Sequence, residues 1–278
     1  MKYNKSLIII LFSVLYFHAA RGKSTVVYKT IDTLSLKMEI IYPDNLNSKE
    51  KYPAIIFFFG GGWNDGTPKQ FEHQAEYFSA RGLICFLVDY RVKSRQGTTP
   101  FESLKDAKSA IRYIRAQAIN FHIDTAKIVA SGGSAGGQLA AATALIKGFN
   151  EQSDDLSISC KPNALILFNP VIDNGPGGYG FERIGNNYKD FSPLHNITKG
   201  SPPTIIFIGT NDQFIPVETV QYYKKVMEKV GSRCDLFLYE GQPHGFFNFK
   251  KDSPSSGEYY YDTLIKADKF LVSLGFIK

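Results

Sequence analysis

The sequence has few cysteines: Cys85, Cys160 and Cys234 are the only three in 278 residues. An odd number provides no disulfide framework, although one disulfide could form in an oxidising compartment. Cys85 and Cys234 lie in or beside apolar, strand-like runs, where a buried thiol is expected. The sequence contains neither a Cys-x-x-Cys motif nor a pair of histidines at metal-ligand spacing, so it suggests no metal site and no cofactor.

Low-complexity tracts and internal repeats are also missing, which argues against a solenoid or a disordered binding protein. The formal net charge of +6 includes Lys2, Lys5 and Arg21, so removal of residues 1–22 would leave 6 − 3 = +3. No stripe of Lys and Arg with interleaved aromatic residues is present, and we expect no nucleic-acid partner. The hydrophobic share of 44% is that of an ordinary globular protein with a sizeable core.

Long hydrophobic runs are scarce, and the clearest one is N-terminal. Residues 7–17 are apolar and follow Lys2 and Lys5. This run is shorter than the roughly 20 residues that span a bilayer. We therefore expect residues 1–22 to be a signal peptide, the protein to be secreted or periplasmic, and no membrane span to remain after cleavage. An uncleaved N-terminal anchor is the alternative.

Apolar runs and helical stretches alternate along the rest of the chain. Apolar runs of strand length without polar alternation are typical of strands buried on both faces of a mainly parallel sheet. Two strand-like stretches in 25–42 come first, and such runs then occupy 52–59, 83–88, 127–130, 164–168, 204–208 and 235–239. Helices are expected at 70–81, 100–119, 135–147, 217–230 and 259–274. This predicts one α/β domain over residues 23–278, with helices on both faces of the sheet. The glycine-rich segment 173–203 is irregular, and a loop of that length is usually functional or mobile.

Ser134 is the candidate nucleophile. It lies in Gly132-Gly133-Ser134-Ala135-Gly136, which fits Gly-x-Ser-x-Gly between an apolar run and a helical stretch. The glycines would allow a tight strand-to-helix turn, and the following helix would direct its N-terminal N–H groups toward the serine. A glycine-rich turn without any chemistry is the alternative for this motif alone.

A serine hydroxyl needs a base, and the base needs an orienting acid. Downstream of Ser134 the histidines are His195, in the irregular segment, and His244, directly after the apolar run 235–239. We expect His244 to be the base, because loops after parallel strands line the ligand crevice. Asp212 follows the run 204–208 and is the expected acid. The alternatives for the acid are Asp235, Glu240 and Asp173, and Asp212 could instead serve as a turn or helix-cap residue.

The run Phe59-Gly60-Gly61-Gly62-Trp63 follows the first buried strand and would let backbone N–H groups approach a substrate oxygen closely. Together with the N–H of Ala135, it would form an oxyanion hole. A flexible glycine turn is the alternative.

These motifs resemble the serine esterases of the α/β-hydrolase superfamily. The resemblance is to the branch with a His-Gly-Gly-Gly-Trp motif, which includes hormone-sensitive-lipase-like esterases and secreted bacterial carbohydrate esterases, and it covers essentially the whole mature chain. It implies an α/β-hydrolase fold with Ser134 as nucleophile, Asp212 and His244 as its partners, and Gly61, Gly62 and Ala135 as oxyanion donors. It also suggests a structural role for Asp89-Tyr90-Arg91.

Two features depart from that family. Phe59 stands where histidine is usual, and no helical cap is expected before the first core strand. The lack of a large cap domain suggests an open site that accepts an ester on a bulky sugar. Trp63 and Tyr179 are then candidate sugar contacts, although both could simply pack the loops.

The sequence therefore predicts a serine carboxylesterase that removes a short acyl group, in particular acetyl, from a carbohydrate or another small-molecule ester. The alternatives are a serine peptidase of the prolyl-oligopeptidase type and a catalytically inactive hydrolase fold used for binding. Ala135 favours the esterase, because the peptidases tend to carry a bulkier aromatic residue there. A candidate for every triad position argues against the inactive fold.

Overall fold

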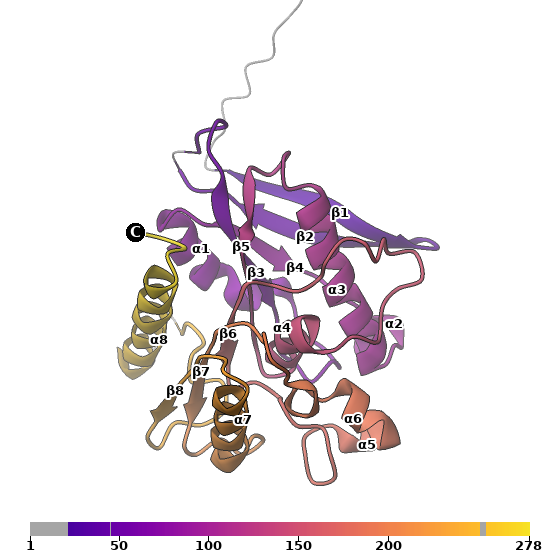
Figure 1. The fold of residues 1–278 in the computed structure, drawn as a ribbon, viewed down its shortest axis with the longest axis vertical. Helices are drawn as coiled ribbons and strands as arrows, with labels where there is room; N and C mark the ends of the chain where they lie inside the picture. Colours follow the sequence, from indigo (N-terminus) through magenta and orange to yellow (C-terminus); the bar gives the residue numbers. More distant parts are fainter. Residues whose placement is uncertain (1–21, 45, 251–253) are drawn as a thin grey trace, which may run out of the picture.

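The computed structural model describes residues 22–44, 46–250 and 254–278 (Figure 1). The expected signal peptide falls almost entirely on residues 1–21, outside the described residues. Among the described helices, none combines the length and apolar character needed to cross a bilayer.

The sheet has eight strands in the order β1-β2-β4-β3-β5-β6-β7-β8. Their bounds are Lys23–Ile31 (β1), Leu34–Ile41 (β2), Tyr52–Phe58 (β3), Ile84–Val88 (β4), Ile123–Gly133 (β5), Ala164–Phe168 (β6), Thr204–Gly209 (β7) and Cys234–Tyr239 (β8). The hairpin β1-β2 joins β4 antiparallel, and all pairs from β4 to β8 are parallel. Every residue of β4, β6 and β7 is buried, which explains their unbroken apolar sequences. The predicted mostly parallel sheet is confirmed.

Each predicted helix is present, with ends that differ by a few residues. The helices are α1 (Glu72–Ala80), α2 (Lys93–Gln96), α3 (Pro100–Ala116), α4 (Ala135–Leu145), α5 (Phe181–Ile184), α6 (Tyr188–Phe191), α7 (Val217–Lys229) and α8 (Pro254–Ser273). Thr99 and Glu102 form a capping box at the start of α3, and Pro100 occupies its first turn. The prediction of an irregular segment at 173–203 needs correction, since it contains α5, α6 and two short 3-10 turns.

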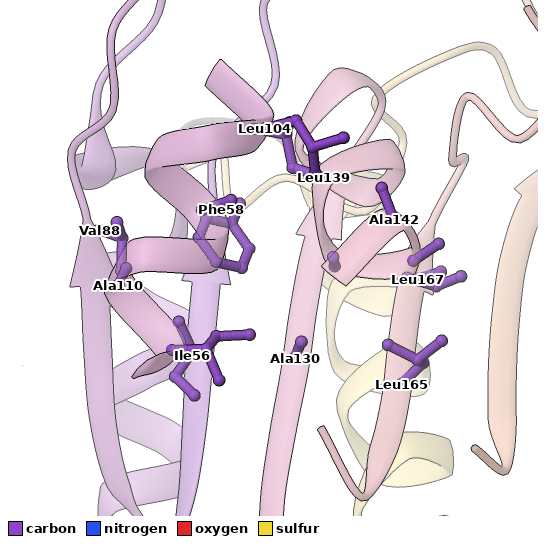
Figure 2. Close-up of a cluster of buried hydrophobic side chains, with 14 of the residues drawn as sticks. Ile56, Phe58, Val88, Leu104, Ala110, Ala130, Leu139, Ala142, Leu165 and Leu167 are labelled. Carbon is purple, nitrogen blue, oxygen red and sulfur yellow. The ribbon is translucent and has the colours of Figure 1, made fainter. Parts of the chain in front are cut away.

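Helices cover both faces of the sheet, as predicted: α3 and α4 lie on one face, and α1 and α8 on the other (Figure 1). Successive side chains of a strand point to opposite faces. Ile56 and Phe58 of β3 accordingly belong to the cluster with Leu104 and Leu139 (Figure 2). Their neighbours in β3 pack in the second cluster with α1 and α8.

Asp89-Tyr90-Arg91 supports the loop after β3, in line with the structural role inferred from the resemblance. The Tyr90 hydroxyl donates to the Phe59 carbonyl oxygen at 2.6 Å, and the two rings stack with centroids 4.0 Å apart. Arg91 binds the fully buried carboxylate of Asp106 through Nε at 2.8 Å. The aromatic stack gives Phe59 a packing role.

All three cysteines have free thiols, so the disulfide that the sequence left open is not formed. Cys85 and Cys234 are buried as expected. Burial raises the pKa of the Cys234 thiol to about 12 and that of Cys85 well above its usual range. Both thiols are therefore unreactive.

Candidate active site

Ser134 occupies a strained turn between β5 and α4, with φ 54° and ψ −119°. Such a conformation persists only where the surroundings hold it in place. The N–H of Ser134 donates to Phe168 O at 3.0 Å, and its carbonyl accepts from the N–H of Val171 at 3.1 Å. A Cβ atom at Gly132 or at Gly136 would come closer than 3.0 Å to backbone atoms. The glycines are thus needed for the approach of α4 to the sheet.

Asp212 and His244 form a hydrogen-bonded pair at the ends of β7 and β8. Asp212 Oδ2 lies 2.7 Å from His244 Nδ1, and the Asp212 side chain is fully buried. Its second oxygen accepts the N–H groups of Phe214 at 2.8 Å and Ile215 at 3.0 Å. The Asp212 carboxylate therefore has two roles: one oxygen stabilises the turn that leads to Ile215, and the other orients the imidazole of His244. It does not cap α7, whose N-cap residue is Pro216.

Asn169, at the end of β6, contacts the other nitrogen of the imidazole. Its Nδ2 lies 3.2 Å from His244 Nε2, and its Oδ1 accepts the N–H of Gly245 at 3.3 Å. This arrangement fits a neutral imidazole with its proton on Nδ1 and a lone pair on Nε2. Within the described residues Ser134 forms no side-chain hydrogen bond, although it lines the same cavity as His244. Catalytic hydrogen bonds are often long before substrate binds.

Two of the three expected oxyanion donors, Gly61 and Gly62, line the same cavity as Ser134, and the third, Ala135, directly follows Ser134 in the sequence. Gly60 lies against the nucleophile, since a Cβ atom there would be 3.4 Å from Ser134 Cβ. The N–H groups of Gly61, Gly62 and Ala135 have no acceptor among the residues that the structure describes. The Gly62 N–H is buried without a partner in the described ranges, which is uncommon, whereas Gly61 is exposed and Ala135 is the first residue of α4. All three N–H groups are therefore available as candidate oxyanion donors.

The cavity above Ser134 has a volume of about 190 Å³ and two chemically different walls. One wall is aromatic: the Tyr179 and Phe214 rings meet edge to face at 5.7 Å, and Phe214 meets the His244 ring at 5.0 Å. The other wall is an amide pair. Gln70 accepts the N–H of Gly60 at 2.6 Å and donates to Asn248 Oδ1 at 3.0 Å. Both walls link the glycine-rich run 59–63, the oxyanion loop, to the loop that carries His244.

Of the two roles that the sequence left open for Trp63, sugar contact and loop packing, the structure supports packing. Its indole is 1% exposed and lines no part of the cavity; it packs on Tyr179 and Phe191. Tyr179 does line the cavity. The positive φ of Trp63, 56°, accompanies this inward packing. Trp63 is therefore a packing residue.

The alternative acids and the alternative base lie elsewhere. Asp235 forms an ion pair with Arg233, with Nη2 and Oδ2 2.5 Å apart. His195 has Asp173 as its nearest carboxylate, 3.9 Å away. In the described ranges no cluster of His, Cys, Asp and Glu side chains is arranged to hold a metal ion.

Sequence reasoning missed Asn169, Gln70, Phe214 and Asn248. Asn169 could have been found, because it directly follows a buried parallel strand, as Asp212 nearly does. The other three reach the cavity through loop packing, which no local pattern in the sequence signals.

Two family models together match most of the chain. Residues 38–176 match the BD-FAE family model, and residues 177–272 match the dienelactone hydrolase family. The chain is 24% identical over 257 residues to a probable isoprenylcysteine alpha-carbonyl methylesterase of Arabidopsis thaliana, covering 82% of this chain and 52% of that protein. It thus spans about half the length of that curated relative.

Solved structures of Thermogutta terrifontis esterase 2 are more similar. The form phosphorylated by paraoxon is 44% identical, with a TM-score of 0.86 over 92% of this chain and 95% of that chain. The butyrate-bound form is 43% identical, with the same TM-score and the same coverage. The chain belongs to the esterases of the α/β-hydrolase superfamily.

Proposed function

We propose that the protein is a serine carboxylesterase that hydrolyses short-chain acyl esters through an acyl-enzyme. The observation that carries the proposal is the Asp212–His244 pair, joined at 2.7 Å, with His244 lining the same cavity as Ser134. The unpaired N–H groups of the oxyanion loop support it.

In this mechanism Ser134 Oγ attacks the ester carbonyl while His244 Nε2 accepts the hydroxyl proton. Asp212 accepts a hydrogen bond from Nδ1–H of His244 and stabilises the imidazolium that forms. The N–H groups of Gly61, Gly62 and Ala135 donate to the oxyanion. His244 then protonates the leaving alcohol, and in the second half it activates the water that releases the acid from Ser134.

The cavity supports a small acyl group, and we propose acetyl on a carbohydrate as the substrate class. The cavity beside Ser134, about 190 Å³ in volume, is large enough for a small acyl group. The aromatic wall offers a surface for a sugar ring, and the amides of Gln70 and Asn248 offer partners for hydroxyl groups. The butyrate complex of Thermogutta terrifontis esterase 2 agrees with a short acyl chain. From the sequence of residues 1–22 alone, we also propose that the protein is exported.

Hydrolysis of 4-nitrophenyl acetate by wild type and by Ser134→Ala tests the reaction. We expect turnover by the wild type only; equal turnover by the variant would refute Ser134 as nucleophile. The enzyme is then incubated with acetylated, feruloylated and unsubstituted glycans, and the released acid is identified. We expect acetate. Comparable turnover of an aminoacyl anilide would instead favour a peptidase.

A further inference from the structure

The oxyanion loop has an unfavourable backbone conformation. Gly61, Gly62 and Trp63 have consecutive positive φ angles of 120°, 62° and 56°. A bulky residue such as tryptophan rarely adopts a positive φ, and it stays there only when its surroundings hold it.

Arg183 holds this loop from a distant part of the chain. Its Nη1 donates a hydrogen bond to the carbonyl oxygen of Gly62. The guanidinium carbon lies 5.2 Å from the centre of the Trp63 ring and 5.5 Å from that of Tyr179. The side chain is 26% exposed, and its Nε donates to Glu182 at 3.1 Å. A bond from a guanidinium to a carbonyl is stronger than a neutral one, and the two rings limit where the group can move.

The start of α5 is shaped for this contact. Gly180 has a φ of 81°, and a Cβ atom there would lie 3.0 Å from Cζ3 of Trp63 and 3.3 Å from Nη2 of Arg183. The hydroxyl of Tyr179 likewise occupies the space that a Cβ atom at Gly62 would need, at 2.6 Å. The segment 173–203 therefore fits closely onto the oxyanion loop.

We propose that Arg183 is a positioning residue for the oxyanion hole, an inference that rests on the esterase function proposed above. A fixed carbonyl holds the peptide plane between Gly62 and Trp63. That plane adjoins, through the Cα atom of Gly62, the plane that carries the N–H of Gly62, one of the expected donors. Arg183 lines no part of the cavity and so acts through the loop. Because an oxyanion donor acts on the tetrahedral state, its misplacement lowers kcat with little change in KM.

The test compares wild type with Arg183→Met and Arg183→Lys. For Arg183→Met we expect kcat for 4-nitrophenyl acetate to fall about 10- to 100-fold, with KM changed by no more than about threefold. The affinity for phenylboronic acid, which forms a tetrahedral adduct with a nucleophilic serine, should fall by the same factor as kcat/KM. Lysine keeps the charge without the planar group, so Arg183→Lys should give intermediate values.

Arg233→Met is the matched control. Arg233 also lies over an aromatic ring, with its guanidinium carbon 4.9 Å from the centre of Phe270, and it binds Asp235 away from the cavity. This variant should keep the wild-type kcat and boronate affinity.

If Arg183→Met has the same kcat and the same boronate affinity as the wild type, the inference is overturned. If that variant does not fold, the same result in Arg183→Lys would overturn it. An active wild type with unaffected Arg183 variants refutes only this inference, whereas an inactive wild type refutes the proposed esterase function as well.

Discussion

The amide Nδ2 of Asn169 lies 3.2 Å from Nε2 of His244, the nitrogen that must accept the proton of Ser134. The lone pair of the proposed base therefore has a partner before any substrate binds. The orientation of the amide is fixed, because Oδ1 of Asn169 accepts the N–H of Gly245. Its backbone is fixed as well, since the Asn169 N–H donates to Phe207 O at 2.7 Å with φ at 32°. The amide N–H of Asn169 thus pairs with the Nε2 lone pair, which is the lone pair that a base needs.

Asn169→Asp tests this contact with a side chain of the same shape. The carboxylate would accept a hydrogen bond from the protonated imidazole and hold His244 as a cation that cannot act as a base. At neutral pH we expect kcat/KM to fall at least about tenfold and to recover as the pH is raised. The pH–rate profiles of the two proteins measure this. Asn120→Asp, at an exposed position, is the control. A wild-type pH–rate profile for Asn169→Asp would contradict a role of the Asn169–His244 contact in catalysis.

Asp212→Asn separates the proposed acid from its alternatives. The amide can still accept the N–H groups of Phe214 and Ile215, so the turn should survive. Its NH2 group cannot accept the Nδ1–H of His244, and the histidine would take the wrong tautomer. We expect kcat to fall by about 10⁴ with unchanged thermal unfolding. Asp235→Asn should keep its activity; the reverse pattern would make Asp235 the acid.

Gly136 sets the distance between α4 and the sheet. A Cβ atom there would come closer than 3.0 Å to the carbonyl oxygens of Phe58 and Phe59, and backbone cannot move aside cheaply. We expect Gly136→Ala to lower the free energy of unfolding by about 1–3 kcal/mol and to lower activity, because Ser134 and the oxyanion loop would be pushed apart. Gly148→Ala is the matched control, since nothing lies within 4 Å of its added Cβ atom. Equal melting temperatures for the two variants would contradict this.

The sequence predicted the site residues that follow one strand each, because the place of such a residue depends only on that strand. Ser134 and Asp212 follow buried apolar runs, and His244 follows the apolar but only partly buried β8. Parallel strands bring their carboxyl ends to one edge of the sheet. The strand order could not be predicted, because it depends on pairings between distant segments.

Side-chain direction in the loops was beyond the sequence as well. The sequence left Trp63 either as a sugar contact or as a loop-packing residue, and in the structure its indole packs inward against Phe191. Arg183 reaches the oxyanion loop across 121 residues, and only the fold of the segment 173–203 creates that contact. Long-range packing therefore decides which loop residues touch a substrate.

The last prediction concerns Lys108, a buried cation on α3. Its Nζ donates to the carbonyl oxygens of Ile146 at 2.6 Å and of Gly148, just after the end of α4. Burial lowers the pKa of Lys108 to about 8 from the usual 10.5, although the two carbonyl partners oppose the loss of the proton. The ammonium group of Lys108 thus binds the carbonyl groups just after the C-terminus of α4, and burying it costs free energy.

Stability should therefore rise with pH at this site. Below about pH 8 both the folded and the unfolded chain hold the proton; between pH 8 and 10.5 the unfolded chain holds more protons than the folded one. The free energy of unfolding of the wild type, relative to Lys108→Met, should increase by up to about 2 kcal/mol from pH 7 to pH 10. Urea titrations of both proteins at the two pH values measure this difference, in which the titrations of groups far from Lys108 cancel. A difference that stays constant would show that Lys108 keeps its proton in the folded protein, and a decrease would mean that the carbonyl partners of Nζ outweigh its burial.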